Sequence, residues 1–218
     1  MQKQEKILWF DSETGGVESK TDALIQLSAI IEINGKIVDE IDLKMKPLPK
    51  KLIHPKAIAT HGMTLQDIAG FEDPYVAYRK FYAFLAGHGP KAKEDRYIMA
   101  GYKSEFDCNF VYQFFADING ITSSERYNPY WDYCQFKPID CLSFVVAMHK
   151  AKLFEAENDK LGTICKVFGI EIKAHDALSD IRATRELTHK ILGRLFTGWK
   201  GEAWGLLGPV NGVENLLL

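Results

Sequence analysis

The decisive stretch is Ile7-Leu8-Trp9-Phe10-Asp11-Ser12-Glu13-Thr14-Gly15-Gly16, a run of apolar residues that ends in two carboxylates and two glycines. The apolar run predicts a buried strand over residues 7–10. Residues two apart in a strand point to the same face, so Asp11 and Glu13 project together from its end. Two acids that close repel each other unless a positive charge lies between them. Gly15 and Gly16 allow a backbone turn and the close approach of a ligand.

Two further aspartates fall on apolar faces of predicted helices. At ~100° per residue, a helix over residues 106–118 has Asp107 in the middle of its apolar arc. A helix over residues 177–195 has Asp180 inside its buried stripe. Aspartate is rarely buried without a partner, so these two residues and the strand-end pair together favour a bound cation. His175 precedes Asp180 by five positions and cannot share its helix face, so a loop position is expected.

These residues carry a family resemblance. The segment 11–15 resembles the first motif of the DEDDh 3′–5′ exonucleases, a family that includes the epsilon proofreading subunit of bacterial DNA polymerase III. Phe106 and Asp107, with Phe110, resemble the second motif, and the His-x4-Asp spacing of residues 175–180 resembles the third. Each motif alone is weak, but all occur in order between residues 7 and 195. Ser12 and Gly16 depart mildly from the family pattern.

The resemblance implies a ribonuclease H-like fold and a two-metal site for Mg²⁺ or Mn²⁺. Two such ions can stabilise the attacking and leaving oxygens of a phosphodiester. On the family's pattern, Asp11 bridges both ions, Glu13 and Asp180 complete the site of the ion that activates water, and Asp107 serves the second ion. His175 takes the proton from the attacking water, and its reference pKa of ~6.5 suits this role. The implied metal ligands are therefore Asp11, Glu13, Asp107 and Asp180.

Each motif also has an ordinary structural interpretation. Asp11 and Glu13 could be a polar strand end, Asp180 a first-turn charge favourable to a helix dipole, and His175 a loop or capping residue. Taken jointly, the five residues favour catalysis.

A substrate-side loop is suggested by residues 57–64, which resemble the corresponding loop of the family. Here His61 and Gly62 either hold the terminal nucleotide or form a turn before a Thr64 N-cap, with His61 solvated. The resemblance adds Thr14, Gly15 and Phe106 to the expected substrate-binding residues. Residues 160–170 resemble the helix that precedes the third motif.

The order of predicted elements is βββαβαβα, an α/β arrangement with a mixed five-stranded sheet flanked by helices. Asn34-Gly35 between apolar runs at 24–33 and 36–45 is a two-residue hairpin signal, so the first three strands form an antiparallel meander. Residues 46–60 are expected to form a loop. Further strands are predicted at 97–101 and 137–140, and further helices at 74–86, 141–151 and 160–168.

Composition sets broad limits. The chain has 218 residues and a formal net charge of −2, so any nucleic-acid contact must be local. Its four cysteines show no metal-ligand spacing, which predicts reduced thiols in a cytoplasmic protein, and no segment is long and apolar enough for a membrane span. We expect an exonuclease domain over residues 1–198 and a tail of uncertain role over 199–218.

Three features allow two interpretations each. Five lysines at positions 44, 46, 50, 51 and 56 form either a phosphate-contacting patch or a solvated loop. Aromatic residues at 127, 130, 131 and 133 either stack bases or, more commonly, pack the 119–136 insert onto the body. The apolar tail could dock on a partner or pack on its own domain.

The sequence therefore predicts a metal-dependent 3′–5′ exonuclease that acts on single-stranded or frayed 3′ ends, with DNA favoured, and releases nucleoside 5′-monophosphates. Alternatives are an RNA-trimming exonuclease with the same site and a non-catalytic polymerase-accessory module. A polymerase or another replication protein is a possible partner.

Overall fold

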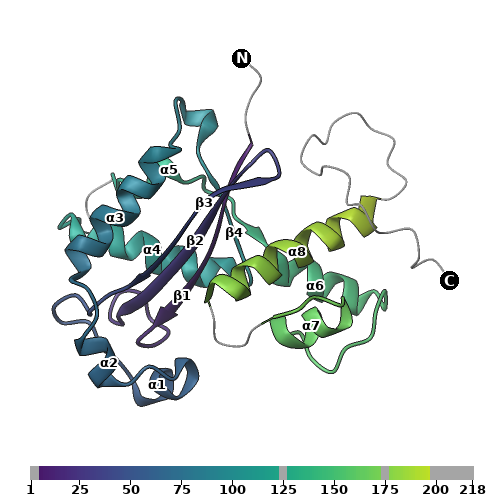
Figure 1. Ribbon diagram of the computed structural model, residues 1–218, viewed down its shortest axis with the longest axis horizontal. Coiled ribbons are helices and arrows are strands. Elements are labelled where there is room, and N and C mark those ends of the chain that lie inside the picture. Colours follow the sequence, from purple (N-terminus) through teal and green to yellow (C-terminus); the bar gives the residue numbers. More distant parts are fainter. Residues whose placement is uncertain (1–4, 123–126, 173–176, 197–218) are drawn as a thin grey trace.

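The computed structural model describes residues 5–122, 127–172 and 177–196, the last three without their side chains (Figure 1). In chain order the elements are β1 (Lys6–Thr14), β2 (Leu24–Ile33), β3 (Lys36–Lys44), α1 (Pro55–His61), α2 (Leu65–Ala69), α3 (Pro74–Gly87), a 3-10 turn (Lys93–Asp95), β4 (Ile98–Gly101), α4 (Ser104–Ile118), α5 (Tyr130–Tyr133), β5 (Ile139–Asp140), α6 (Cys141–Lys150), α7 (Leu161–Val167) and α8 (Ala177–Phe196). No helix within these ranges is long and apolar enough to cross a membrane.

The five strands form one mixed sheet in the order β3-β2-β1-β4-β5. β1 pairs antiparallel with β2, and β2 with β3, whereas β4 and β5 run parallel to β1. The predicted meander and mixed five-stranded sheet are therefore confirmed. The hairpin turn is confirmed as well, because Asn34 and Gly35 have φ values of 51° and 79°, as a type I′ turn requires.

Helices cover both faces of this sheet (Figure 1). Leu8 and Phe10 of β1 belong to the large core that α3 and α4 complete. Ile7 and Trp9 point to the other face, where Ile181 of α8 packs against them. This alternation makes β1 the central strand of a helix–sheet–helix sandwich.

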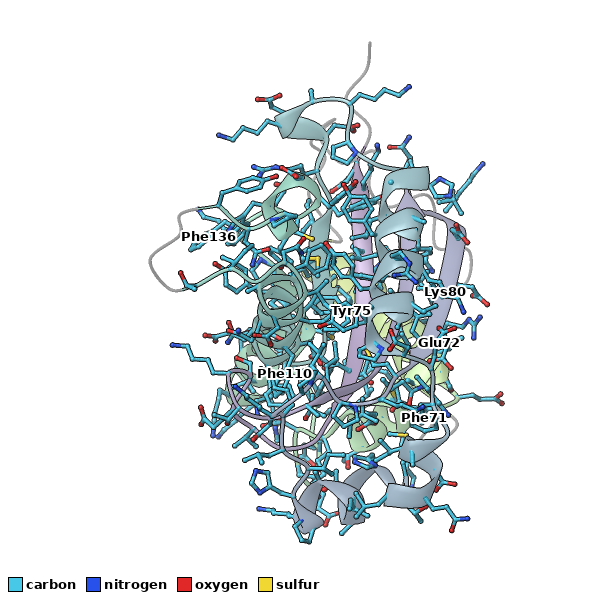
Figure 2. The ribbon with its side chains drawn as sticks, turned by 90° about the vertical axis from the view of Figure 1, so that its left-hand side faces the viewer. Phe71, Glu72, Tyr75, Lys80, Phe110 and Phe136 are labelled. Atoms are coloured by element: carbon cyan, nitrogen blue, oxygen red, sulfur yellow. The ribbon has the colours of Figure 1, made fainter. Side chains whose placement is uncertain are left out.

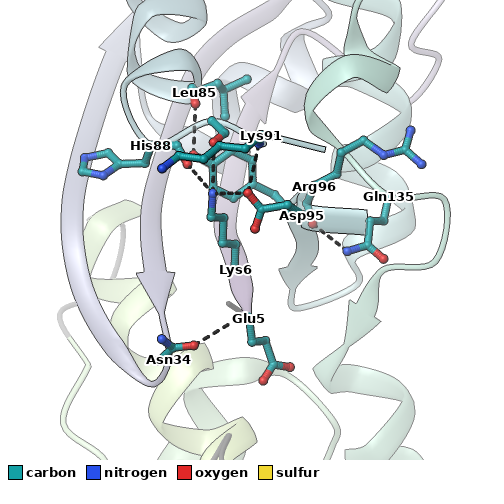
Figure 3. Close-up of polar contacts among 11 residues, drawn as sticks. Glu5, Lys6, Asn34, Leu85, His88, Lys91, Asp95, Arg96 and Gln135 are labelled. Atoms are coloured by element: carbon teal, nitrogen blue, oxygen red, sulfur yellow. Dashed lines mark hydrogen bonds and ion pairs between the residues drawn. The ribbon is translucent and has the colours of Figure 1, made fainter. Parts of the chain in front are cut away.

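The start of β1 is anchored by a buried lysine (Figure 3). Lys6 Nζ donates hydrogen bonds to the carbonyl oxygens of His88 and Gly89, each at 3.0 Å, and to Asp95 Oδ2 at 2.8 Å. These bonds tie β1 to the segment that connects α3 with β4. A lysine buried this deeply is tolerable because all three hydrogens of its ammonium group have acceptors.

Three predictions of local structure need correction or refinement. The loop expected over residues 46–60 contains most of α1, a helix with no buried residue and no side-chain N-cap, so it lacks the usual helix signals. The fifth strand has only two residues, because only Ala100 and Gly101 of β4 pair with it. In the insert, Tyr130 and Tyr133 are buried against the α3–α4 core, which confirms the packing interpretation for them, while Phe136 is 80% exposed (Figure 2).

Candidate active site

The first two acids lie inside β1 rather than beyond its end. Asp11 stands opposite Ser28 of β2, and Glu13 stands opposite Gln26. Since Ile7 and Trp9 face α8, the two-residue period of the strand carries Asp11 and Glu13 to the same face. The prediction that the two carboxylates share one face is confirmed.

Asp107 reaches the same region from the first turn of α4. Its side chain is buried, and its Oδ1 accepts hydrogen bonds from the Ser12 backbone nitrogen at 3.0 Å and from Ser12 Oγ at 2.5 Å. Ser12 lies between the two strand acids, so these bonds fix Asp107 beside them. Sequence reasoning assigned Ser12 no chemical role, whereas the structure shows that it positions Asp107.

The start of α4 is itself held by a residue that the motifs did not indicate. Asp140, at the end of β5, accepts hydrogen bonds through Oδ1 from the backbone nitrogens of Lys103 at 2.8 Å and Ser104 at 3.3 Å. Lys103 has a left-handed backbone with φ of 66°. Such a conformation in a residue with a side chain costs roughly 1–3 kcal/mol and is common at functional sites. Asp140 thus offsets this cost and fixes the turn that carries Asp107.

The helix that carries Asp180 is fastened to the sheet by a buried glutamate. Glu32 of β2 is 1% exposed; its Oε2 accepts a 2.9 Å hydrogen bond from Trp9 Nε1 and a short ion-pair contact from Arg185 Nε. Arg185 also donates to the Gly35 carbonyl at 2.9 Å. Burial alone would raise the pKa of Glu32, but His189 and Arg185 outweigh it and lower the pKa. The charged clamp therefore fixes α8, and with it the half-buried Asp180 in its first turn, over the sheet.

The four carboxylates interact electrostatically. The pKa of Asp11 is raised well above its usual value by burial and then by repulsion from Asp107, Glu13 and Asp180. Burial raises the pKa of Asp107 to about 7, against the hydrogen bonds from Ser12 that lower it. The fold thus brings together four acids from one strand and two helices, whose negative charges oppose one another.

This donor set fits hard divalent cations. Mg²⁺ and Mn²⁺ prefer carboxylate oxygens and retain bound water, so few protein ligands suffice. A cation would also relieve the repulsion that raises the pKa of Asp11. Within residues 5–122, 127–172 and 177–196, no group of three or more His, Cys, Asp or Glu side chains is already close enough to hold a metal ion. His175 lies outside the described residues, so its predicted loop position and role stay predictions.

A cleft of about 690 Å³ opens beside the carboxylates. Four residues of the predicted site line it: Glu13, Thr14, His61 and Phe106. Gly15 and Gly62 do not. A Cβ at Gly15 would lie 2.1 Å from the Leu52 carbonyl oxygen, so its small size accommodates the protein's own backbone. The expectation that the glycines let a ligand approach is therefore wrong for Gly15, where glycine is needed because the Leu52 backbone packs against it.

His61 ends α1, and Gly62 caps this helix with a φ of 74°. His61 Nδ1 accepts a 3.0 Å hydrogen bond from the Met63 nitrogen, and burial lowers the pKa of the ring. Its Nε2 is buried and has no hydrogen-bond partner in the described part of the chain. Thr64 is the predicted N-cap, with a capping box to Asp67. The interpretation of residues 61–64 as a turn before an N-cap at Thr64 is thus confirmed. Its expectation of a solvated His61 is wrong, because His61 is half-buried in the cleft wall.

Two cleft residues that contact each other were missed by sequence reasoning: Asp22 and His54. His54 Nε2 lies 3.1 Å from Asp22 Oδ1. Asp22 also accepts hydrogen bonds from the Glu18 nitrogen at 2.9 Å and from Thr21 Oγ1 at 3.1 Å. Burial would raise the pKa of Asp22, but these bonds and His54 lower it below its usual value. No sequence spacing signals this pair, because loop contacts bring its two residues together.

The lysine run does not act as one patch. Lys51 is 10% exposed and forms a 2.7 Å ion pair with Asp117, and its Nζ donates to the carbonyl oxygens of Ser19 and Lys20 at 2.9 and 2.8 Å. The phosphate-contacting interpretation is therefore wrong for Lys51. Lys56, in contrast, lines the cleft.

Replacing Lys51 by glutamine should lower the free energy of unfolding by about 2 kcal/mol, because it leaves Asp117 and two carbonyl oxygens without their cation. Urea denaturation measures this loss. Lys50→Gln, at an exposed neighbouring position, is the matched control and should change stability by less than about 0.5 kcal/mol. Equal stability of the two variants would show that this half-buried ion pair contributes nothing.

Comparison with known proteins agrees with this geometry. The sequence model of a family described as "Exonuclease" matches residues 8–188, most of the chain. Ribonuclease T of Photobacterium profundum is 25% identical over 206 residues, which cover 87% of this chain and 81% of that protein. The PolC-type DNA polymerase III of Oceanobacillus iheyensis is 25% identical over 187 residues, 85% of this chain but 11% of the polymerase.

Among solved structures, E. coli exonuclease I in complex with a dT13 oligonucleotide has a TM-score of 0.68 and 22% identity, over 88% of this chain and 42% of that chain. This likeness confirms the ribonuclease H-like fold. The chain belongs to the exonuclease family, and its resemblance to the DEDDh-type 3′–5′ exonucleases is confirmed.

Proposed function

We propose that the protein is a metal-dependent 3′–5′ exonuclease that hydrolyses phosphodiester bonds at the 3′ end of single-stranded or frayed nucleic acid. The observation that carries this proposal is the Asp11 carboxyl group, whose pKa is raised by burial among Asp107, Glu13 and Asp180. A negative charge on Asp11 is unfavourable in the metal-free protein, and bound divalent cations would compensate it. A non-catalytic accessory module would have no need of these carboxylates.

The site residues have distinct roles in this proposal. Asp11, Glu13, Asp107 and Asp180 provide oxygen ligands, and Ser12 orients Asp107 through its two hydrogen bonds. Two Mg²⁺ or Mn²⁺ ions, when bound, would activate water and stabilise the developing charge on the phosphate. His175 would accept the proton of the attacking water. The products would be nucleoside 5′-monophosphates.

The cleft provides a place for the 3′-terminal nucleotide. Phe106 lines it and packs beside Phe110 with the ring centroids 5.0 Å apart, so its ring offers a base a flat, preorganised surface. Lys103 Nζ lies 5.5 Å from the Phe106 ring centroid, where it adds a positive charge for the strand. Thr14 and His61 also line this cleft. Gly15 and Gly62, which were predicted to bind substrate, would do so only through their backbone groups.

DNA is the favoured substrate, and RNA is the second candidate. The similarity to PolC-type DNA polymerase III supports DNA and also a replication partner, whereas the similarity to proteins named ribonuclease T supports RNA. We further propose that residues 1–198 form the exonuclease domain, which agrees with the family match to 188 and with α8 ending at Phe196. The four cysteines are free, in keeping with a cytoplasmic location. The tail at 199–218 lies outside the described residues.

The test is product analysis of DNA and RNA oligonucleotides of one sequence, incubated with Mg²⁺, with Mn²⁺ or with a chelator. The proposal expects nucleoside 5′-monophosphates only when a divalent cation is present, and a larger kcat/KM for DNA. A larger value for RNA would transfer the assignment to the second candidate. Release of nucleoside 3′-monophosphates, or equal rates in the chelator, would contradict the two-metal chemistry.

A further inference from the structure

The residue pair Asp22–His54 stands in the cleft wall apart from the four carboxylates. The Asp22 side chain is 3% exposed, whereas that of His54 is 51% exposed. The carboxylate is thus enclosed by protein and the imidazole opens to solvent. Both residues line the same cleft as Glu13 and Phe106.

The backbone around the pair is firmly placed. The His54 nitrogen donates to the Gly15 carbonyl at 2.7 Å, and the Ala23 nitrogen donates to the Leu52 carbonyl at 2.9 Å. These bonds fasten the segment that carries His54 to the end of β1 and to the start of β2. A Cβ at Gly16 would lie 2.1 Å from Asp22 Oδ2 and 2.6 Å from His54 Cδ2, so glycine at this position makes room for the pair.

The acidic lining of the cleft suggests a role for His54 in binding nucleic acid. Glu13, Glu18 and Asp22 are acidic lining residues, and Glu13 interacts electrostatically with Asp11, another proposed metal ligand. A nucleic-acid strand is a polyanion and needs cationic partners in such surroundings. Burial lowers the pKa of His61 and so disfavours its charged form. His54 and Lys56, two residues apart, remain as the cation-forming side chains of the lining.

We propose that His54, oriented by the buried Asp22, binds a phosphate of the substrate strand on the 5′ side of the scissile bond, with Lys56 as a second cation. This inference rests on the proposed exonuclease function and adds a binding residue to it. Because Nε2 contacts the Asp22 carboxylate, Nδ1 is the ring nitrogen left for a phosphate oxygen. An imidazolium has hydrogens on both nitrogens and can donate a charge-assisted hydrogen bond to each partner. Asp22 is a positioning residue, because it acts through His54.

Kinetics on two substrates test the proposal. One is the oligonucleotide that the wild-type protein degrades best; the other is thymidine 5′-(p-nitrophenyl phosphate), which has no second phosphate. His54→Ala should raise KM for the oligonucleotide about tenfold with kcat within about twofold, and should raise KM for the ester at least fivefold less. The dependence of log KM on log salt should flatten by about 0.7, the value for one contact to a single strand. His54→Lys should recover part of the loss.

Controls separate binding from folding. Lys20→Ala removes an exposed cation from the loop that carries Asp22, outside the cleft lining, and should leave both substrates unaffected. Asp22→Asn should raise KM less than His54→Ala does, and the double variant should be no worse than His54→Ala, because the two residues act as one unit. Losses of equal size on oligonucleotide and ester would overturn the proposal, since the pair would then only maintain the fold of the site.

Failure of the proposed function would look different. The wild-type protein would then hydrolyse neither substrate with Mg²⁺ or Mn²⁺. Fluorescence anisotropy of a labelled single-stranded DNA would still decide the role of His54. An affinity about tenfold weaker for His54→Ala than for Lys20→Ala would support the phosphate contact, and equal affinities would reject it.

Discussion

Replacement of Asp11 by alanine should abolish hydrolysis and, in the absence of divalent cations, raise the melting temperature. Activity should fall by about a thousandfold or more, because a metal centre contributes several kcal/mol to stabilising the transition state. Stability should rise because the variant removes a half-buried carboxyl group that three other acids repel. Oligonucleotide degradation and differential scanning calorimetry measure the two effects. Asp180→Ala should abolish activity in the same way.

The gain in stability should depend on pH. The folded-state pKa of Asp11 is raised, so the carboxyl group costs stability above that pKa, where it is charged, and costs little below its unfolded-state value of 3.8. The difference in melting temperature between Asp11→Ala and wild type should therefore be large at pH 8 and shrink toward pH 4. Glu155→Ala, which removes an exposed acid, is the control and should change neither property. Wild-type activity in purified Asp11→Ala would disprove the site.

Replacement of His175 by alanine should lower kcat by about a hundredfold to ten-thousandfold, the range that general-base catalysis contributes. Affinity for Mn²⁺, measured by calorimetry, should stay close to wild type, because we expect His175 to act as a base and not as a metal ligand. The reason lies in the sequence: a residue five positions before Asp180 lies off its helix face. The rise of kcat with pH that a single base produces should also disappear. A large loss of Mn²⁺ affinity would instead make His175 a ligand.

Much of the fold was predictable because its signals are local. Asn34-Gly35 determined the hairpin, and Pro74 after the N-cap Asp73 marked the start of α3. The helices α4 and α8 were found from their apolar faces. By contrast, α1 packs no residue into the core, so no periodicity marked it. The length of β5 could not be predicted from the sequence either, because it depends on how far β4 extends beside it.

The four acids of the candidate site were predictable from the sequence, whereas the residues that hold these acids in place were not. Asp11 and Glu13 lie two residues apart in one strand, and Asp107 and Asp180 stand out as acids on apolar helix faces, so each has a local signal. The supports join residues remote in sequence: Ser12 with Asp107, Asp140 with the start of α4, and Glu32 with Arg185. Contacts of that kind depend on tertiary structure. The same reason explains the error at Lys51, whose partner Asp117 lies on a different element.

The most direct measurement of the central claim is the direction and metal dependence of strand degradation. A single-stranded DNA labelled at its 5′ end should give a ladder of products that shortens with time in Mg²⁺ or Mn²⁺, while the same strand labelled at its 3′ end should release labelled mononucleotide at once. Neither reaction should occur in a chelator or with Asp11→Ala. Immediate release of mononucleotide from the 5′ label, or internal cleavage without a ladder, would contradict a 3′–5′ exonuclease.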